Sequence, residues 1–110
     1  MYNGKIRVLM IKPIERPKVC YVEPTIKTFR RVINARDIQA KRLEIGVYVI
    51  FNKGSFLSDN TPNRYIGDSI IKGTMIVVAT DEKRVPISLT DDKVSKYNLR
   101  FGNVETFDEI

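Results

Sequence analysis

Apolar residues in this chain recur mostly in short alternating runs, which predicts a protein built largely from β-strands. The first run, residues 5–12, carries apolar side chains on both of its alternating faces. A strand of that kind is typical of the middle of a sheet, where both faces are covered. The proline-containing segment 13–17 then leads into a second run, 18–22, so the chain is predicted to open with a β-hairpin.

Segment 25–34 instead has the period of an amphipathic helix, with Thr25 as its N-cap and Asn34 as its end. At about 100° per residue, its apolar stripe lies nearly opposite a group of basic residues. The stripe comprises Ile26, Phe29, Val32 and Ile33, and the basic group comprises Lys27, Arg30 and Arg31.

Four further strands are predicted, at 38–43, 46–51, 74–80 and 84–88, and 55–57 is a candidate for a short return strand. Charged residues in 38–43 and Pro86 in 84–88 indicate edge strands, because charge and proline both discourage pairing with another strand.

A second helix is predicted to begin after Thr90, which is an N-cap followed by two aspartates in the first turn. Leu89 and Val94 have the spacing of a hydrophobic staple. Val94, Tyr97 and Phe101 are expected to face inward, and Gly102 is expected to end the helix.

The predicted order, β-β-α-β-β-β-β-α, indicates an α+β fold: a mostly antiparallel sheet of about five to six strands with two helices on one face. With 110 residues, the chain is long enough for one domain and too short for two. We expect that domain to span residues 1–102 and to be followed by an acidic tail at 103–110.

The net charge of +6 is unevenly distributed. Residues 1–53 contain 12 basic and 4 acidic residues, whereas residues 54–110 contain 7 and 9. The excess makes a nucleic-acid or anion-binding surface a candidate, with Tyr48 and Tyr65 available to stack on bases. The alternative is a solvated helix face that binds nothing. The candidate basic residues are Lys27, Arg30, Arg31, Arg36, Lys41 and Arg42.

The chain contains no histidine and a single cysteine, Cys20. It therefore has no imidazole base, no Ser-His-Asp triad, and too few thiolates for a zinc site. We expect no catalytic residue, no metal and no cofactor, and we interpret Cys20 as a small buried apolar residue. Chemistry based on carboxylates alone, for example Asp59 with Asp68, is the remaining enzymatic alternative.

The polar segment 58–64 separates two strongly apolar runs and is interpreted as a recognition loop. Asp59, Asn63 and Arg64 are its candidate ligand-binding residues, because the planar guanidinium of arginine suits carboxylate or phosphate and asparagine both donates and accepts. The structural alternative is that Asn63 caps a turn and Arg64 bridges main-chain carbonyls.

Several short motifs resemble a known family. They are Leu57 followed by Pro62-Asn63-Arg64, then Ile70 to Thr74, the strand from Val8 to Pro13, the helix ending near Asn34, and Ser88 to Asp92 with Tyr97 and Phe101. Together they resemble the domain-of-unknown-function family 3846, small proteins of bacteria, phages and mobile elements. The resemblance implies an α+β domain and a phage or mobile-element origin, and it implies no reaction, ligand or catalytic residue.

We therefore expect a non-enzymatic binding protein, such as an accessory or counter-defence factor that binds a host protein or sequesters a small anionic, nucleotide-like ligand. The alternative is a nucleic-acid-binding protein that uses the basic face of the first helix. The lack of a long apolar run predicts a cytoplasmic location without membrane contact. Exposed sheet edges leave a homo-oligomer open.

Overall fold

The structure is a computed structural model that describes residues 4–54 and 61–103. Its ten elements confirm the predicted α+β class. In chain order they are β1 (Ile6–Ile11), β2 (Lys18–Val22), α1 (Ile26–Ile33), β3 (Ile38–Glu44), β4 (Val47–Asn52), β5 (Pro62–Ile66), β6 (Ser69–Lys72), β7 (Met75–Thr80), β8 (Pro86–Ile87) and α2 (Asp91–Arg100).

The main sheet has six strands, all paired antiparallel, and five of them follow the order β2-β1-β7-β4-β3. The short strand β8 also pairs with β7, beyond the stretch that β1 occupies. β3 and β2 therefore form the edges, and β1 and β7 lie inside the sheet. This arrangement confirms the interpretation of 5–12 as an inner strand and of 38–43 as an edge strand.

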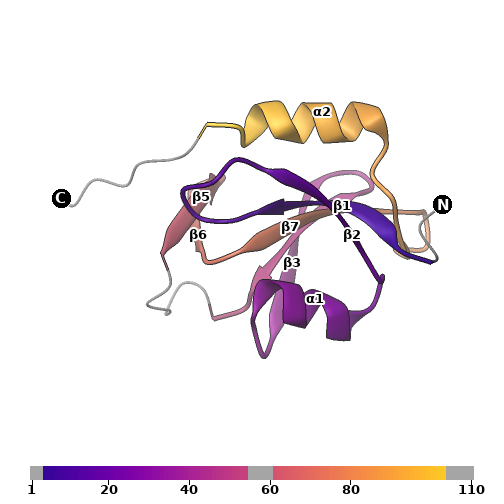
Figure 1. Cartoon of the computed structure of the whole chain (residues 1–110), viewed down its shortest axis with the longest axis horizontal. Helices are drawn as coiled ribbons and strands as arrows, with labels where there is room; N and C mark the ends of the chain where they lie inside the picture. The colour runs from indigo at the N-terminus through magenta and orange to yellow at the C-terminus, as the bar shows by residue number, and fades with distance from the viewer. Residues whose placement is uncertain (1–3, 55–60, 104–110) are drawn as a thin grey trace.

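The two helices lie on opposite faces of the main sheet (Figure 1). The prediction that both helices share one face was wrong. The inner strands are apolar on both sides, so each face needs its own cover: all five residues from Met75 to Ala79 are buried. α2 covers the face formed by Leu9, Val49 and Val77, and α1 covers the face formed by Val8, Ile50 and Ile76.

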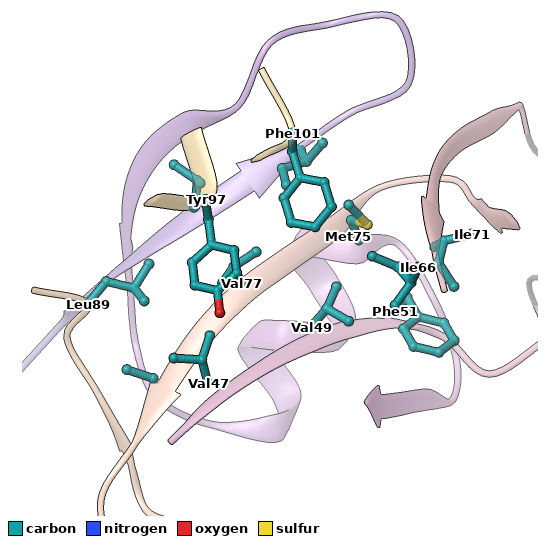
Figure 2. Packing of buried hydrophobic residues seen from close by; sticks show 13 residues of the cluster. Val47, Val49, Phe51, Ile66, Ile71, Met75, Val77, Leu89, Tyr97 and Phe101 are labelled. Carbon is teal, nitrogen blue, oxygen red and sulfur yellow. The ribbon is translucent and has the colours of Figure 1, made fainter. Parts of the chain in front are cut away.

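Under α2, the core is built around two aromatic residues of the helix end, Tyr97 and Phe101, whose rings stack with centroids 6.2 Å apart. Figure 2 shows both rings directed towards the strands, with Leu89 beside them. Val94 packs against the same cluster. The inward face predicted for this helix is thus confirmed.

Both helix starts and the end of α1 match the caps expected from the sequence. The Thr25 hydroxyl accepts a hydrogen bond from the Thr28 amide at 3.1 Å, and the Thr90 hydroxyl accepts one from the Lys93 amide at 3.3 Å. Asn34 ends α1 in the left-handed conformation, with φ of 60°. Gly102 follows Phe101, the C-cap of α2.

A second, two-stranded sheet formed by β5 and β6 was not predicted. Residues 62–64 belong to β5 rather than to a loop, and the turn after Ile66 uses Gly67 with φ of 62°. Ile66 and Ile71 of this hairpin join the core beside Phe51, as Figure 2 shows. The candidate strand 55–57 and Asp59 lie outside the described residues.

In the part of the chain that the structure describes, neither helix has the length and apolar composition needed to cross a membrane.

Candidate functional site

Asn63 and Arg64 lie in the interior, each with an exposed fraction of 1%. The Asn63 amide nitrogen donates to the main-chain oxygens of Ile11 and Gly73, both at 2.8 Å. It thereby links the end of β1 to the segment between β6 and β7.

The Arg64 guanidinium donates to main-chain oxygens from two distant segments. Its Nε and Nη2 donate to Phe101 O at 3.2 and 3.1 Å, and Nη2 also donates to Glu15 O at 2.7 Å. Its Nη1 donates to the Asn63 side-chain oxygen at 2.9 Å. These contacts fit the structural interpretation of Arg64, which bridges main-chain carbonyls, whereas Asn63 joins two segments from within β5 and does not cap a turn. The third candidate of this set, Asp59, lies outside the described residues.

A second polar cluster joins the end of β3 to α2. The Glu44 carboxylate accepts hydrogen bonds from Lys93, from the Tyr97 hydroxyl, and from Lys96 at 2.7 Å. These bonds, that from Lys93 foremost, lower the pKa of Glu44 from its ordinary 4.5 to about 2. Burial, and then the bond to Glu44, raises the pKa of the Tyr97 phenol. The cluster holds the Glu44 carboxylate against the helix.

The basic residues predicted on the first helix are exposed. Lys27, Arg30 and Arg31 all lie on the outer side of α1, and Arg36 is exposed in the connection to β3. The ion pairs found among residues 4–54 and 61–103 do not involve any of these four. Arg30 and Arg31 stand in the last helical turn, where the helix dipole favours positive charge, which gives them a structural role as well.

The remaining two predicted basic residues, Lys41 and Arg42, point to opposite faces of the sheet, because successive side chains of a strand alternate. Lys41 Nζ reaches the main-chain oxygen of Ile66 at 3.5 Å, on the side of the β5–β6 hairpin. Arg42 pairs across the sheet with Tyr48 on the other side. The six basic candidates therefore do not form one patch.

On the face that α1 covers in part, two adjoining hollows form an open groove between β3 and β8. The larger has a volume of about 670 Å³, and Tyr48, Thr80 and Arg84 line both. We call this surface the β3–β8 groove. The residues that line only one of the two hollows are Ala40, Arg42, Ile45, Gly46, Ile50, Val78, Asp81, Glu82, Lys83 and Pro86.

A row of paired residues crosses the floor of this groove. Arg42 of β3 is the cross-strand partner of Tyr48 of β4, and Tyr48 is the partner of Val78 of β7. Directly opposed side chains in an antiparallel pair lie about 5 Å apart at Cβ. The register therefore places a guanidinium, a phenol ring and an apolar side chain next to one another.

The β7–β8 turn forms the rim of the groove. One Asp81 carboxylate oxygen accepts the amides of Lys83 and Val85 at 2.8 and 2.9 Å, so Asp81 shapes the turn. Arg84 adopts a left-handed conformation with φ of 64°, and its amide donates to Asp81 O at 3.0 Å. The turn thereby brings Arg84 and Lys83 to the same hollow as Arg42, together with the acidic Glu82.

A family model described as "Domain of unknown function (DUF3846)" matches residues 6–102. The chain belongs to the DUF3846 family. Comparison with curated proteins and with solved structures gave no significant match. The α+β class expected from the resemblance is confirmed for this DUF3846 domain.

The groove of this DUF3846 domain combines arginine side chains with an aromatic ring over an apolar floor. Guanidinium groups bind phosphate or carboxylate oxygens in a planar, bidentate manner. A phenol ring offers a stacking surface to a planar ring. Among the described residues, no group of three or more Cys, Asp or Glu is arranged to hold a metal ion.

Sequence patterns indicated only part of this groove. Arg42 and Tyr48 were already candidates, whereas Arg84 and Thr80 were not. The available signal was the basic pair Lys83 and Arg84, at the start of the predicted strand 84–88, but sequence alone does not show which face of the sheet this pair lies on. The position of these two residues relative to the sheet depends on the pairing of β8 with β7.

Proposed function

We propose that this protein is a non-enzymatic binding protein that holds an anionic, nucleotide-like ligand in the β3–β8 groove. One observation carries the proposal: Arg42, Tyr48 and Arg84 line the same groove, with Arg42 and Tyr48 paired across neighbouring strands. Phosphate oxygens would meet the two guanidinium groups, and the planar ring of the ligand would stack on Tyr48.

The composition of the floor supports a ligand with a ring. The smaller hollow is lined mainly by apolar side chains, with Arg84 as its one charged residue among the described residues that line it. An apolar floor beside a phenol favours a flat aromatic body, and base stacking on an aromatic side chain contributes about 1–3 kcal/mol. The apolar lining residues are Ala40, Ile50, Val78 and Pro86.

Charge in the larger hollow favours an anion, although two carboxylates are present. One Asp81 oxygen is engaged by main-chain amides, and the hollow is lined by three basic residues, Arg42, Lys83 and Arg84, against two acidic ones, Asp81 and Glu82. A positive excess at a concave site raises the local concentration of anions. A ligand carrying phosphate is therefore preferred over a neutral nucleoside.

The test is a polarisation titration of the purified protein with fluorescent nucleoside mono-, di- and triphosphates. We expect binding that weakens about tenfold or more in Arg42→Glu and in Tyr48→Ala, each of which removes a contact of about 1–3 kcal/mol. Lys53→Glu is the matched charge control, because Lys53 is exposed in the turn after β4. Equal losses in Lys53→Glu and Arg42→Glu, or no binding by the unaltered chain, would contradict the proposal.

Recovery of the ligand tests the non-enzymatic part of the proposal. The chain lacks histidine, so it has no imidazole for proton transfer near neutral pH. Mass spectrometry of the nucleotide after prolonged incubation should find it unchanged. Any turnover that is lost in Tyr48→Ala or Arg42→Glu would overturn this assignment.

A second candidate is nucleic-acid binding along α1, favoured by the exposure of Lys27, Arg30 and Arg31 without an ion pair in the described part of the chain. It predicts affinity that falls steeply with salt, because each neutralised phosphate releases counterions. The triple change to Glu should abolish binding to DNA or RNA while leaving the nucleotide titration unaltered. No binding by the unaltered chain at about 50 mM salt would remove this candidate.

The biological setting is also a proposal. The resemblance described above supports an accessory factor of a phage or mobile element, including a counter-defence role towards a host protein or nucleotide signal. Purification from the host followed by native mass spectrometry would identify a retained nucleotide or a bound host protein. Neither species would be found if the setting is different.

A further inference from the structure

The turn between β7 and β8 is held by hydrogen bonds that all involve Asp81. The Arg84 amide donates to the Asp81 main-chain oxygen at 3.0 Å, and the Asp81 amide donates to Val85 O at 2.9 Å. The amides of Lys83 and Val85 both donate to Oδ1 of the Asp81 carboxylate, at 2.8 and 2.9 Å. Every amide from Lys83 to Val85 is therefore engaged by Asp81.

The Asp81 carboxylate replaces a main-chain carbonyl in the β7–β8 ladder. Because Thr80 faces Pro86, Asp81 and Val85 are the next pair in register. In a hydrogen-bonded antiparallel pair, the amide of each residue donates to the carbonyl of the other. Here the Val85 amide donates instead to the Asp81 side chain. The Asp81 carbonyl is thereby left to accept the Arg84 amide, and this bond closes the turn.

Arg84 occupies a backbone position that ordinarily takes glycine. In the commonest β-turn, Asp or Asn is favoured at the first residue and Gly at the fourth. Arg84 is the fourth residue of the turn that begins at Asp81, and its φ is 64°. A long side chain at positive φ is uncommon, and such a conformation persists only where the surrounding structure holds it. The bonds to Asp81 supply that support.

This turn conformation carries the Arg84 side chain to the β3–β8 groove. Arg84 lines both hollows, whereas Lys83 lines only the larger one. In the part of the chain that the structure describes, no ion pair or hydrogen bond holds the Arg84 guanidinium. The main-chain amides of residues 83–85 are already engaged, so contact between these residues and an anion depends on their side chains.

We infer that Asp81 is a positioning residue of the anion site and that it acts through Arg84. Its carboxylate holds the turn in the conformation that brings the guanidinium to the groove, although its charge by itself opposes the binding of an anion. Without the two bonds to Oδ1, the turn would populate other conformations. The apparent affinity of a site falls with the fraction of molecules in the binding conformation. The inference rests on the proposed function, because it concerns the same ligand.

The two effects of Asp81, as acceptor and as charge, have opposite signs and can be separated. Both amides bond to one oxygen, and the side-chain oxygen of asparagine can also accept two hydrogen bonds. Asp81→Asn therefore keeps both bonds and removes the charge, whereas Asp81→Ala removes both. Glu82→Ala is the matched control, because it removes a charge from the same hollow without breaking a hydrogen bond to any described residue.

A polarisation titration with a fluorescent nucleoside triphosphate measures these effects. We expect Asp81→Ala to weaken binding about fivefold or more, because the turn loses two hydrogen bonds. Asp81→Asn and Glu82→Ala should bind at least as tightly as the unaltered chain, because each removes a negative charge beside the anion. Equal affinities of Asp81→Ala and Asp81→Asn would overturn the inference.

A double variant tests whether Asp81 acts through Arg84. Arg84→Gly removes the guanidinium and leaves a residue that adopts positive φ without strain. In that background, Asp81→Ala should weaken nucleotide binding by no more than about twofold, because the side chain that Asp81 positions is absent. A further loss as large as the one seen when Arg84 is present would show that Asp81 does not act through Arg84.

Amide hydrogen exchange, measured by NMR, reports on the turn without a ligand. The Lys83 and Val85 amides should exchange about fivefold or more faster in Asp81→Ala than in Asp81→Asn. Unchanged exchange would show that the carboxylate does not hold the turn. No nucleotide binding by the unaltered chain would contradict the proposed function and this inference together. Binding that Arg42→Glu weakens and Asp81→Ala does not would contradict this inference alone.

Discussion

The guanidinium of Arg64 donates twice to the main-chain oxygen of Phe101, at 3.2 and 3.1 Å. Phe101 is the C-cap of α2, so a buried cation on the β5–β6 hairpin satisfies a carbonyl that the helix leaves without an internal partner. The same guanidinium reaches Glu15 in the β1–β2 connection at 2.7 Å. One side chain therefore joins three segments that are distant in sequence: the β5–β6 hairpin, the end of α2 and the β1–β2 connection.

Removing this side chain should destabilise the fold rather than abolish a binding activity. We expect Arg64→Met to lower the free energy of unfolding by about 3 kcal/mol. The variant loses hydrogen bonds from a charged group, and it leaves buried main-chain carbonyls without a donor. Urea denaturation followed by circular dichroism measures the loss. Arg31→Met, the same change on the exposed face of α1, should cost less than about 0.5 kcal/mol. Equal stabilities of the two variants would show that the contacts of Arg64 contribute little.

The Glu44 cluster should give the protein an acid-dependent component of stability. The pKa of Glu44 is lowered from 4.5 to about 2 in the folded state, so its contribution is fully present above pH 4.5 and is lost as the pH falls towards 2. Thermal melts of the unaltered chain and of Glu44→Gln should differ most above pH 4.5 and converge near pH 2. The control is Glu82→Gln, in an exposed turn. A constant difference across this pH window would show that the carboxylate charge does not contribute in this way.

Gly102 should not tolerate a side chain. A Cβ at this position would lie 2.5 Å from the main-chain oxygen of Asn98, which belongs to the last turns of α2. We expect Gly102→Ala to cost about 1–3 kcal/mol, since the helix end must shift and carry Phe101 with it. Gly54→Ala is the matched control, because the nearest atom to its added Cβ is the end of the Asn52 side chain, at 3.6 Å. Chemical denaturation of both variants measures the difference.

Stacking and hydroxyl contributions of Tyr48 to ligand binding can be separated. If the ring provides a stacking surface, Tyr48→Phe should keep nucleotide affinity within about threefold, whereas Tyr48→Leu should lose about tenfold or more. Both changes preserve an apolar side chain at a half-buried strand position. The polarisation titration measures the two affinities. A loss in Tyr48→Phe as large as that in Tyr48→Leu would instead assign the role to the hydroxyl.

Local features of this fold followed from local sequence. The caps at Thr25, Asn34 and Thr90 are where the sequence predicted them, because a cap is formed by a side chain and main-chain groups three or four residues away. The edge position of β3 could also be predicted from sequence, because its charged residues are compatible with an edge and not with an inner strand.

The β5–β6 hairpin escaped prediction because two of the buried residues of β5 are polar. Asn63 and Arg64 break the alternation that marks a strand, and a buried arginine is acceptable only where carbonyls from elsewhere in the chain converge on it. Those carbonyls come from Glu15 and Phe101, which are 49 and 37 positions away. The sequence around Arg64 therefore does not indicate its hydrogen-bond partners.

The sequence by itself determined the α+β class, the helix boundaries and the two-sided apolar strands, since each depends on periodicity and capping within a few residues. Tertiary structure decided which face each helix covers, that Lys41 and Arg42 are separated by the sheet, and that Arg42, Tyr48 and Arg84 meet in one groove. These outcomes depend on strand order and register, which place residues from β3, β4 and the β7–β8 turn side by side. Such long-range pairings are fixed by packing of the whole sheet and leave no signature in any single segment.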